Sequence, residues 1–417
     1  MRWILRIVGG LFLLVVIAVA GLTAVYLANR EQITDLAKPD HIDRAVATAS
    51  PELIEKASAR LMRMREEQSF PSVSIAVASG GQIVWAEAAG YADLAAKRPA
   101  TTQTQYSIGS TSKPLTASLV VRLADQGVID LDKDIRTYAP SFPQKPYVVT
   151  ARELLSHQGG IRHYGFNLTP PLFSESVSQT QYNSATASLA VFANDPLLFE
   201  PDTNFNYSSF GYTLLSAAVE GTTHAHFLEV MQREIFTPLA MTCAGPDDRL
   251  RANPERASEY QNFARDGYVV PAPYSNLSMK WAGGGFRATP SDLARFGIAL
   301  LDGKIVTPQS RDLMFTPRTL RSGKVNAQHY GLGFRVVEWP DKARPDKPFR
   351  AAHHGGLAVG TRTLLIVMPS DNVVVAFSGN AVSFDFGVFD TISDIAIMFA
   401  EEARRTGATA APAGAAP

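Results

Sequence analysis

Residues 106–117 read Tyr-Ser-Ile-Gly-Ser-Thr-Ser-Lys-Pro-Leu-Thr-Ala, so Ser110 is followed three residues later by Lys113. Residues three apart on a helix share a face, and a helix that begins here sets the lysine amine beside the serine hydroxyl. Gly109 permits a flexible entry, and Pro114 is tolerated in a first helical turn. A serine needs a neighbouring base to become a nucleophile, and a lysine is such a base only while part of it is neutral. The stretch therefore predicts a helix N-terminus with a candidate nucleophile and its base.

The sequence after this stretch supports a helix. An apolar face follows in Leu115, Leu119, Val120 and Leu123, and Gly127 stands where a C-terminal cap belongs. Free N–H groups at the helix start favour developing negative charge near Ser110. Ser-x-x-Lys is a short pattern, however, and taken alone it is equally compatible with the start of a surface helix. The interpretation therefore depends on motifs further along the chain.

Composition sets limits on the kind of protein. The chain has 417 residues, of which 46% are hydrophobic and 19% charged, so it can bury a large core in one or two domains. Lysine plus arginine and aspartate plus glutamate each number 39, so no nucleic-acid partner is indicated. The single cysteine, Cys243, excludes an internal disulfide, and the histidines show no metal-binding pattern. We expect no metal and no cofactor.

The N-terminal segment predicts a membrane attachment. Residues 7–29 carry no charge and follow a short basic start, which is typical of a bilayer-spanning helix with a cytoplasmic N-terminus. We expect residues 1–29 to anchor the chain in a bacterial cytoplasmic membrane, with the rest on the periplasmic side. A cleaved signal peptide is the alternative, because Ala18-Val-Ala20 fits a cleavage site. Residues 30–50 are expected to form a charged stalk.

The order of the predicted elements indicates the fold class. A helix is expected over 51–68, then a β-hairpin over 72–87 with a glycine turn, then a largely helical middle. The glycines of segment 281–286 indicate a close backbone approach, and residues 289–292 predict a helix start with Thr289 as its cap. Strands dominate the last third, and a final helix is expected from residue 384 to residue 403, before a disordered tail over 404–417. This order predicts an α+β domain over 51–403. Its antiparallel sheet takes strands from both ends of the chain, with a helical subdomain inserted between them.

Three motifs in order resemble those of the serine β-lactamase-like hydrolases, which include penicillin-binding proteins, class C β-lactamases, D-aminopeptidases and related esterases. Ser110 to Lys113 matches the first motif. Tyr207-Ser208-Ser209 matches the Tyr-x-Asn motif, with Ser209 in place of the asparagine, and His353-His354-Gly355 matches the third. The flanking segments 156–164 and 280–286 resemble the branch of this family found in animal mitochondria, which also lacks that asparagine.

The resemblance implies a β-lactamase/transpeptidase-like fold and an acyl-enzyme mechanism. Ser110 would attack a carbonyl, with Lys113 and Tyr207 as the base system. The N–H of Gly356 would bind the oxyanion beside that of Ser110. His353, in place of a lysine, would bind a substrate carboxylate weakly and only when protonated. Gly355 would also contact the substrate, as would Ser209 through its hydroxyl. Which of Lys113 and Tyr207 is the general base stays open.

With the membrane anchor expected from residues 7–29, the resemblance indicates a membrane-anchored hydrolase of small peptides, amides or esters, with weak or no β-lactamase activity and possible homo-oligomers. Two alternatives stay open. One is a non-catalytic, penicillin-recognising or self-assembling envelope protein. The other is an esterase of lipids or short-chain esters.

Overall fold

The computed structural model describes residues 2–165, 175–262, 264–382 and 387–408. Its centre is an antiparallel sheet in the order β11-β12-β13-β14-β3-β4-β2. The strands are β11 (Arg335–Trp339), β12 (Phe349–Leu357), β13 (Arg362–Met368), β14 (Val373–Gly379), β3 (Ser72–Ser79), β4 (Gln82–Asp93) and β2 (Ile42–Ala47), with β5 (Arg98–Pro99) paired to β4. The β14–β3 pair joins the two ends of the chain, so this part of the predicted fold is confirmed.

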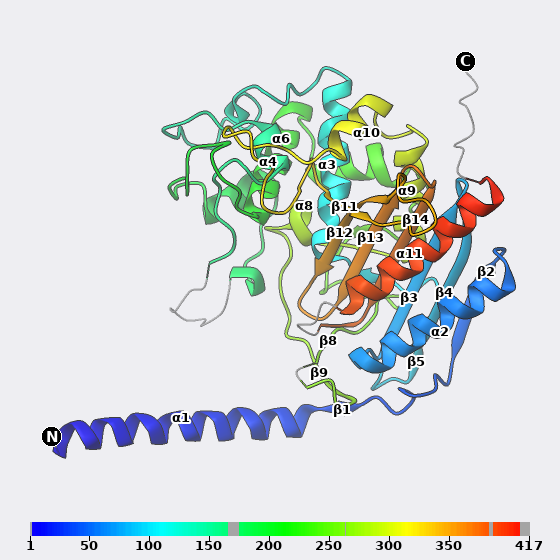
Figure 1. Ribbon diagram of the computed structural model, residues 1–417. Helices are drawn as coiled ribbons and strands as arrows, with labels where there is room; N and C mark the ends of the chain where they lie inside the picture. The colour runs from blue at the N-terminus through cyan, green and yellow to red at the C-terminus, as the bar shows by residue number, and fades with distance from the viewer. Residues whose placement is uncertain (1, 166–174, 263, 383–386, 409–417) are drawn as a thin grey trace.

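Helices cover both faces of the sheet (Figure 1). The two helices α2 (Pro51–Gln68) and α11 (Gly387–Thr406) pack together on one face, and α9 (Pro290–Leu301) packs on the other. The cap of α9 is as predicted, because the Thr289 side chain accepts from the N–H of Asp292. The remaining helices are α1 (Arg2–Asn29), α3 (Ser112–Asp125), α4 (Ala151–Leu155), α5 (Ala185–Ser188), α6 (Ser209–Thr223), α7 (Phe227–Met231), α8 (Trp281–Gly284) and α10 (Pro308–Met314).

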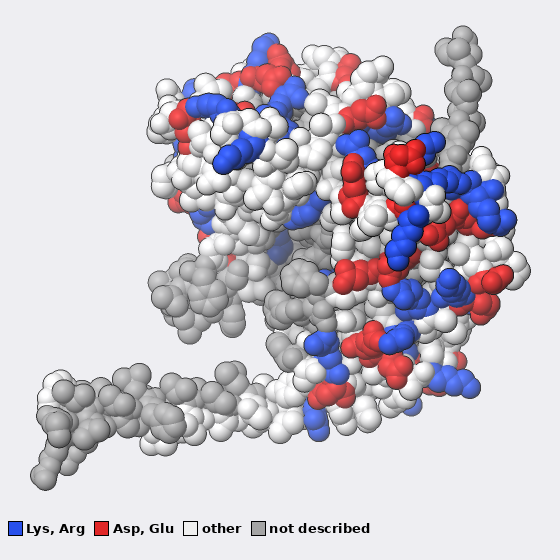
Figure 2. Space-filling view, in the orientation of Figure 1, with Lys and Arg blue, Asp and Glu red and all other residues white. Residues whose placement is uncertain are grey.

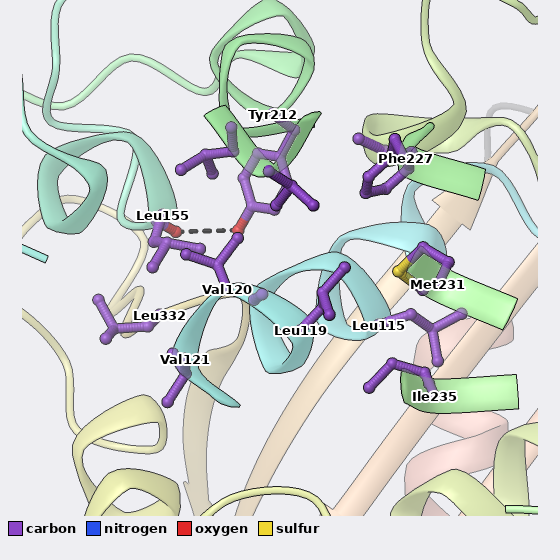
Figure 3. Close-up of a cluster of buried hydrophobic side chains, with 14 of the residues drawn as sticks. Leu115, Leu119, Val120, Val121, Leu155, Tyr212, Phe227, Met231, Ile235 and Leu332 are labelled. Carbon is purple, nitrogen blue, oxygen red and sulfur yellow. Dashed lines mark hydrogen bonds between the residues drawn. The ribbon is translucent and has the colours of Figure 1, made fainter. Parts of the chain in front are cut away.

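Helix α3 is the buried axis of the helical half of the molecule. Leu115, Leu119 and Val120 are fully buried, and they pack with side chains from α6 and α7 (Figure 3). The hydroxyl of Tyr212, on α6, donates to the Leu155 carbonyl at 2.9 Å across this core. Because α3 is packed on all sides, the residues at its N-terminus are held in fixed positions.

Two small sheets complete the fold. One has the order β1 (Glu31–Gln32), β9 (Tyr268–Pro271), β8 (Tyr260–Gln261) and β15 (Ala381–Val382). The other has the order β6 (Tyr106–Ser107), β10 (Phe286–Ala288) and β7 (Gly245–Pro246), and β6 leads directly into the Ser110 turn.

The segment expected as a stalk is packed on the domain instead. Residues 42–47 form β2, which pairs with β4, and residues 31–32 pair with β9. The Oδ1 atom of Asp35 lies 2.6 Å from Nη2 of Arg65, and both side chains are fully buried. At the other end, α11 continues to Thr406, and Arg404 pairs with Asp371 at 2.5 Å. The folded domain therefore extends beyond the predicted 51–403 at both ends, and the tail from residue 409 lies outside the described residues.

Within the part of the chain that the structure describes, no helix has both the length and the hydropathy that a membrane span requires. The span expected over residues 7–29 therefore stays a proposal.

Candidate active site

Ser110 lies on a short 3-10 turn, Gly109–Thr111, that leads into α3. Gly109 has φ +50°, and a Cβ there would lie 2.8 Å from the carbonyl carbon of Leu357. A glycine is therefore needed for both the left-handed backbone and the close approach of β12. This contact places the serine beside the end of that strand.

Lys113 is fully buried directly behind Ser110. Its Nζ atom lies 3.2 Å from Ser110 Oγ, 2.9 Å from Ser209 Oγ and within hydrogen-bond distance of the Gly283 carbonyl. Burial lowers the pKa of Lys113 far below its ordinary value, and the cations of Arg335 and Lys280 lower it further. The structure thus holds a lysine that favours the neutral form in contact with the serine.

The three contacts define where the lysine's protons go. A neutral amine has two N–H donors and one lone pair. The Gly283 carbonyl can only accept, so it takes one N–H, and Ser209 Oγ can take the other. The lone pair then faces Ser110, whose hydroxyl has a proton to give. This is the arrangement that a general base requires.

The close backbone approach predicted for the glycine segment 281–286 is present, and it brings the Gly283 carbonyl into contact with Lys113. A Cβ on Gly283 would lie 3.1 Å from Ser209 Cβ, and a Cβ on Gly284 would lie 3.5 Å from the carbonyl carbon of Gly109. Small residues therefore let the backbone of α8 reach both Lys113 and the Ser110 turn.

Ser209 begins α6 and is placed by two histidines. His157 Nδ1 accepts the N–H of Ser208 at 3.1 Å, and His163 Nδ1 accepts the N–H of Ser209 at 3.2 Å. Both histidines are therefore unprotonated at these nitrogens, and burial lowers the pKa of His163 to about 4. The segment 156–164 thus has a structural part in the site.

Tyr207 lies across the site from the lysine. Its ring centroid is 4.8 Å from Lys113 Nζ, and Tyr207 lines the same cavity as Ser110, whose side chain is near enough to lower its pKa. Burial raises the pKa of Tyr207 to about 12, although Arg335 and the Ser110 contact act in the opposite direction. At neutral pH the phenol keeps its proton, so the group ready to accept a proton from Ser110 is the amine of Lys113.

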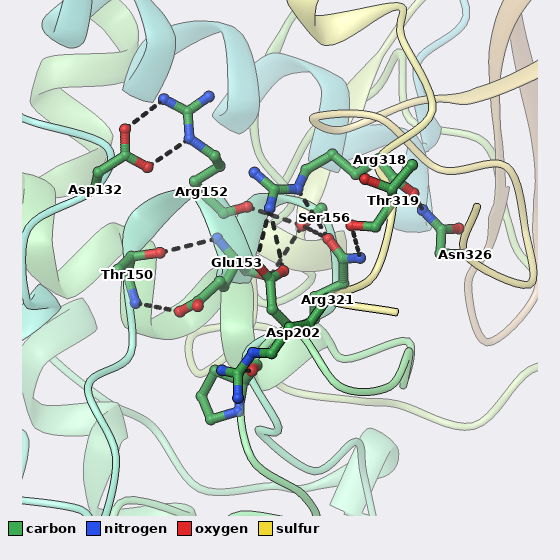
Figure 4. A network of polar contacts seen from close by, with 12 residues as sticks. Asp132, Thr150, Arg152, Glu153, Ser156, Asp202, Arg318, Thr319, Arg321 and Asn326 are labelled. Carbon is green, nitrogen blue, oxygen red and sulfur yellow. Dashed lines mark hydrogen bonds and ion pairs between the residues drawn. The ribbon is translucent and has the colours of Figure 1, made fainter. Parts of the chain in front are cut away.

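The loop that carries Tyr207 is fastened by a polar network (Figure 4). Arg318 Nη2 lies 3.1 Å from Asp202 Oδ1, and Arg318 Nε donates to Gln158 Oε1 at 2.9 Å. Gln158 in turn donates to the Thr319 carbonyl. The network connects the loops around residues 158, 202 and 318, so the position of Tyr207 does not depend on its own segment alone.

The hydrogen-bond register of β12 decides which of its N–H groups are free. Alternate residues of an antiparallel strand point their N–H and C=O groups to opposite edges. The N–H of Ala358 donates to the Thr361 carbonyl at 3.1 Å, so Gly356, two residues earlier, also faces β13. Leu357 faces the opposite edge, which is open beyond the end of β11 and lies against Gly109. The free N–H beside the Ser110 turn is therefore that of Leu357, one residue after the predicted Gly356.

The two histidines of the third motif lie on opposite faces of β12. His354 is buried on the side of Lys113 and Tyr207, where its Nδ1 contacts the Gly355 carbonyl at 2.8 Å and its Nε2 contacts the Tyr330 hydroxyl at 2.9 Å. A carbonyl cannot donate, so Nδ1 carries the proton and Nε2 accepts from Tyr330. His353 faces away and lies against Phe389, with ring centroids 4.8 Å apart.

One cavity of about 1450 Å³ is lined by the candidate residues other than Lys113, which is buried behind Ser110. Ser110, Tyr207, Ser209, His353, Gly355 and Gly356 all line it, and Arg335, Lys280 and Arg249 add positive charge. Charged side chains of both signs are interspersed over the sheet side of the molecule (Figure 2). The described part of the chain has no cluster of three His, Cys, Asp or Glu side chains suited to a metal ion.

A fold of this kind, with a serine and a lysine at a buried helix start, defines the class of serine hydrolases with a β-lactamase/transpeptidase-like fold. The sequence pattern of the Beta-lactamase family matches residues 53–394, so the chain belongs to that family. It is 30% identical over 400 residues to the human "Serine beta-lactamase-like protein LACTB, mitochondrial", covering 76% of this chain and 72% of that protein. The predicted family, including its mitochondrial branch, is confirmed.

Solved structures agree with the fold. An octameric penicillin-binding protein homologue from Pyrococcus abyssi superimposes with a TM-score of 0.67 at 22% identity, covering 85% of this chain and 77% of that one. EstCE1, described as a hydrolase with promiscuous acyltransferase activity, gives a TM-score of 0.69 at 20% identity, covering 82% and 98%.

The sequence analysis did not single out several residues of the site, among them Gly283, Arg335, His354 as a buried member of the site, and Leu357. The glycine run around Gly283 was a usable signal, because it predicted a close backbone approach. Alternation along β12 would have separated His353 from His354 if the strand's buried face had been known. Arg335 gave no signal, because an arginine at the start of a strand is ordinary.

Proposed function

We propose that this protein is an acyl-transferring serine hydrolase that acts on a small peptide, amide or ester. The observation that carries the proposal is the contact of Lys113 Nζ with Ser110 Oγ in a buried site that disfavours the charged amine. Lys113 accepts the proton of Ser110 as the serine oxygen attacks the substrate carbonyl. Of the two groups left open by the sequence, Lys113 is therefore the base for acylation.

Tyr207 completes the proton path. Its hydroxyl, in contact with Ser110, carries a proton at neutral pH and donates it to the leaving group as the bond to the carbonyl breaks. Water then attacks the ester on Ser110, and the same groups act in reverse.

The N–H groups of Ser110 and Leu357 bind the oxyanion in this proposal. The donor expected from the sequence was Gly356, but the register of β12 directs that N–H toward β13. Loss of one such donor typically costs about 3 kcal/mol of transition-state stabilisation. His353 is likewise unsuited to the carboxylate-binding role expected of it, because burial lowers its pKa to about 3 and keeps it neutral.

The test is covalent labelling by a fluorophosphonate and turnover of nitrophenyl esters. We expect Ser110→Ala to abolish both while the protein stays folded. Ser118→Ala is the matched control, because Ser118 lies on the same helix and its hydroxyl has no partner among the described residues. Labelling of Ser110→Ala at the wild-type rate would exclude Ser110 as the nucleophile.

A non-catalytic envelope protein is the alternative from another class. Such a protein needs at most one acylation of Ser110 and no release of the acyl group, so turnover separates it from an enzyme. Stoichiometric labelling by a fluorescent penicillin without turnover of any ester or peptide would favour it.

We also propose, from the uncharged segment 7–29, that the chain is anchored in a bacterial cytoplasmic membrane with the catalytic domain on the periplasmic side. Protease added to spheroplasts should remove the domain, and the mature N-terminus should remain Met1. A mature chain that begins at Gly21 would show a cleaved signal peptide instead.

A further inference from the structure

His163 is a half-buried side chain in the wall of the cavity that the proposed mechanism leaves unused. Its Nδ1 atom accepts the N–H of Ser209 at 3.2 Å. An imidazole nitrogen that accepts a hydrogen bond carries no proton, so in the neutral ring the proton is on Nε2. The backbone of Ser209 therefore fixes the tautomer in which Nε2 is a donor. That nitrogen has no hydrogen-bond partner among the described residues.

Two aromatic rings hold the imidazole of His163 in this orientation. The ring of Tyr164 lies against it, with centroids 4.4 Å apart and an interplanar angle of 33°. The ring of Tyr207 meets it almost at a right angle, with centroids 5.6 Å apart. Tyr164 is itself packed edge-on against Phe210, on α6, at 5.1 Å. The Nε2–H group is therefore an oriented donor, and such a donor loses little conformational entropy when it binds an acceptor.

The imidazole of His163 is neutral at physiological pH. Burial lowers its pKa to about 4, and the cations of Lys113, Lys280 and Arg162 act in the same direction, whereas Glu175 acts against them. Because the lone pair of Nδ1 is already occupied by the backbone N–H, the ring has no free nitrogen with which to accept a proton from water or from the serine. What the ring offers to a ligand is one uncharged N–H donor, which matches an uncharged oxygen acceptor.

This donor lies close to the reacting groups. The Lys113 amine contacts both Ser110 Oγ, at 3.2 Å, and Ser209 Oγ, at 2.9 Å. His163 in turn contacts the backbone N–H of Ser209. An oxygen of the substrate that meets Nε2 would therefore lie only a few bonds from the carbonyl that Ser110 attacks.

The neighbours of His163 indicate which part of the substrate carries this oxygen. In the proposed mechanism the leaving group takes its proton from Tyr207, whose ring has Arg335, the first residue of β11, over it. His163 belongs to a different part of the cavity wall, together with Tyr164 and Lys280, whose Nζ atom lies 5.4 Å from the Tyr164 ring centroid. With the leaving group directed toward β11, the acyl group is the part of the substrate that extends along this wall.

We propose that His163 determines which acyl groups the enzyme accepts, by donating its Nε2–H to an uncharged oxygen a few bonds from the reacting carbonyl. The inference rests on the proposed function and specifies its substrate. A second carbonyl at such a distance is present in N-acylated amino acids and in peptides, and it is absent from plain fatty acyl chains. Because Ser209 has no amide nitrogen to donate, this imidazole supplies an N–H donor at that wall. The inference favours a peptide-like acyl group over that of a lipid ester.

The test compares two para-nitrophenyl esters, the levulinate and the valerate. Their acyl chains have the same length, but the levulinate has a ketone oxygen where the valerate has two hydrogens, and the leaving group is identical. We measure the ratio of kcat/KM for levulinate to that for valerate, after subtraction of spontaneous hydrolysis. The effect of the ketone on the intrinsic reactivity of the ester is common to all variants, so the change of this ratio on substitution reports the contact with the protein.

Two substitutions separate the two nitrogens of the imidazole. In His163→Asn the amide oxygen can replace Nδ1 as acceptor of the Ser209 N–H, but no atom reaches the position of Nε2. In His163→Gln the amide nitrogen reaches that position. We expect His163→Asn to lower the levulinate-to-valerate ratio by about three- to ten-fold, the range of one neutral hydrogen bond, and His163→Gln to keep a higher ratio than His163→Asn. A ratio that His163→Asn leaves unchanged, or equal ratios in the two variants, would overturn the assignment to Nε2.

His329→Asn is the matched control. His329 lines the same cavity, is exposed and has φ +49°, a conformation that asparagine adopts readily. Its ratio should equal that of the wild type, and an equal fall in this variant would overturn the inference. Turnover of both esters with no effect of His163→Asn on the ratio would overturn the inference and leave the hydrolase proposal in place. Absence of both fluorophosphonate labelling and ester turnover in the wild type would instead overturn the hydrolase proposal.

Discussion

The Nζ atom of Lys113 lies 2.9 Å from the Oγ atom of Ser209, the residue that stands where related enzymes have an asparagine. The hydroxyl thus takes over one task of the missing amide, which is to accept a hydrogen bond from the lysine. It has no second polar atom to offer to a substrate. The substitution therefore preserves the base and changes what the pocket can bind.

Ser209→Asn should raise the rate of acylation by penicillins. The amide oxygen can keep the Lys113 contact, and the amide nitrogen adds a donor worth about 1.5–3 kcal/mol if it meets a polarised group. Activity on a good ester should fall, because Gly283 lies close to the Ser209 side chain and leaves little room for a larger one. Acylation rates of both variants with one penicillin and one ester test this. Equal penicillin rates would mean that residue 209 does not contact the bound β-lactam.

Lys113→Met should abolish activity and change how the stability of the protein depends on pH. The pKa of Lys113 is lowered on folding, so between its folded and its unfolded pKa the unfolded chain binds more protons, and the wild type loses stability as the pH falls through that range. The methionine variant lacks this loss. Its melting temperature, relative to that of the wild type, should therefore rise as the pH falls from 9 to 6. Its labelling by fluorophosphonate should be absent. A difference in melting temperature that does not change with pH would show that the lysine is charged in the folded state.

Gly356 and Gly355 should respond differently to alanine. A Cβ on Gly356 would lie 2.0 Å from the Ile108 carbonyl oxygen, whereas one on Gly355 would make ordinary contacts of 3.7 Å or more. Gly356→Ala should therefore destabilise the protein by about 1–3 kcal/mol through overpacking against the Ser110 turn. Gly355→Ala should unfold at nearly the wild-type urea concentration. Similar midpoints for the two variants would contradict the placement of β12.

Asp35→Ala should destabilise the domain by about 3–5 kcal/mol, because it leaves Arg65 buried without its carboxylate partner. Urea denaturation measures the loss. Glu67→Gln serves as the control, because the pair between Arg63 and Glu67 is exposed on the same helix and its removal should leave the midpoint unchanged. An Asp35→Ala midpoint equal to that of the control would show that segment 30–36 does not belong to the folded domain.

Local patterns predicted local structure well. The α2 helix, the β3–β4 hairpin, the α3 helix with Ser110 and Lys113 at its start, and the Thr289 cap all follow from spacing and capping residues close together in the chain. The errors concern long-range pairing. Nothing near residues 42–47 shows that they pair with β4, because a short charged strand at a sheet edge resembles a linker.

The candidate site likewise has some features that local sequence predicts and others that depend on long-range pairing. The motif residues were found by type and spacing, but the free N–H on β12 depends on which neighbour each residue bonds to, and that is set by β13 and β11. The position of His354 similarly depends on its contact with the Tyr330 hydroxyl, which comes from another segment of the chain. These properties depend on how the chain packs in the folded protein, and no short stretch of sequence indicates them.

The pairing of β14 with β3 also bears on how the chain acquires its structure. Ser72 donates its N–H to Asn380 Oδ1 at 2.7 Å, across a sequence separation of 308 residues. The hairpin β3–β4 is synthesised long before β14. The edge of β3 that pairs with β14 therefore stays unpaired until almost the entire chain has been made. Contacts of such sequence separation form slowly, and an uncovered strand edge invites pairing with another chain. We therefore expect refolding from urea to be slow and its yield to fall as protein concentration rises, so this protein should depend on chaperones until its C-terminal strands arrive.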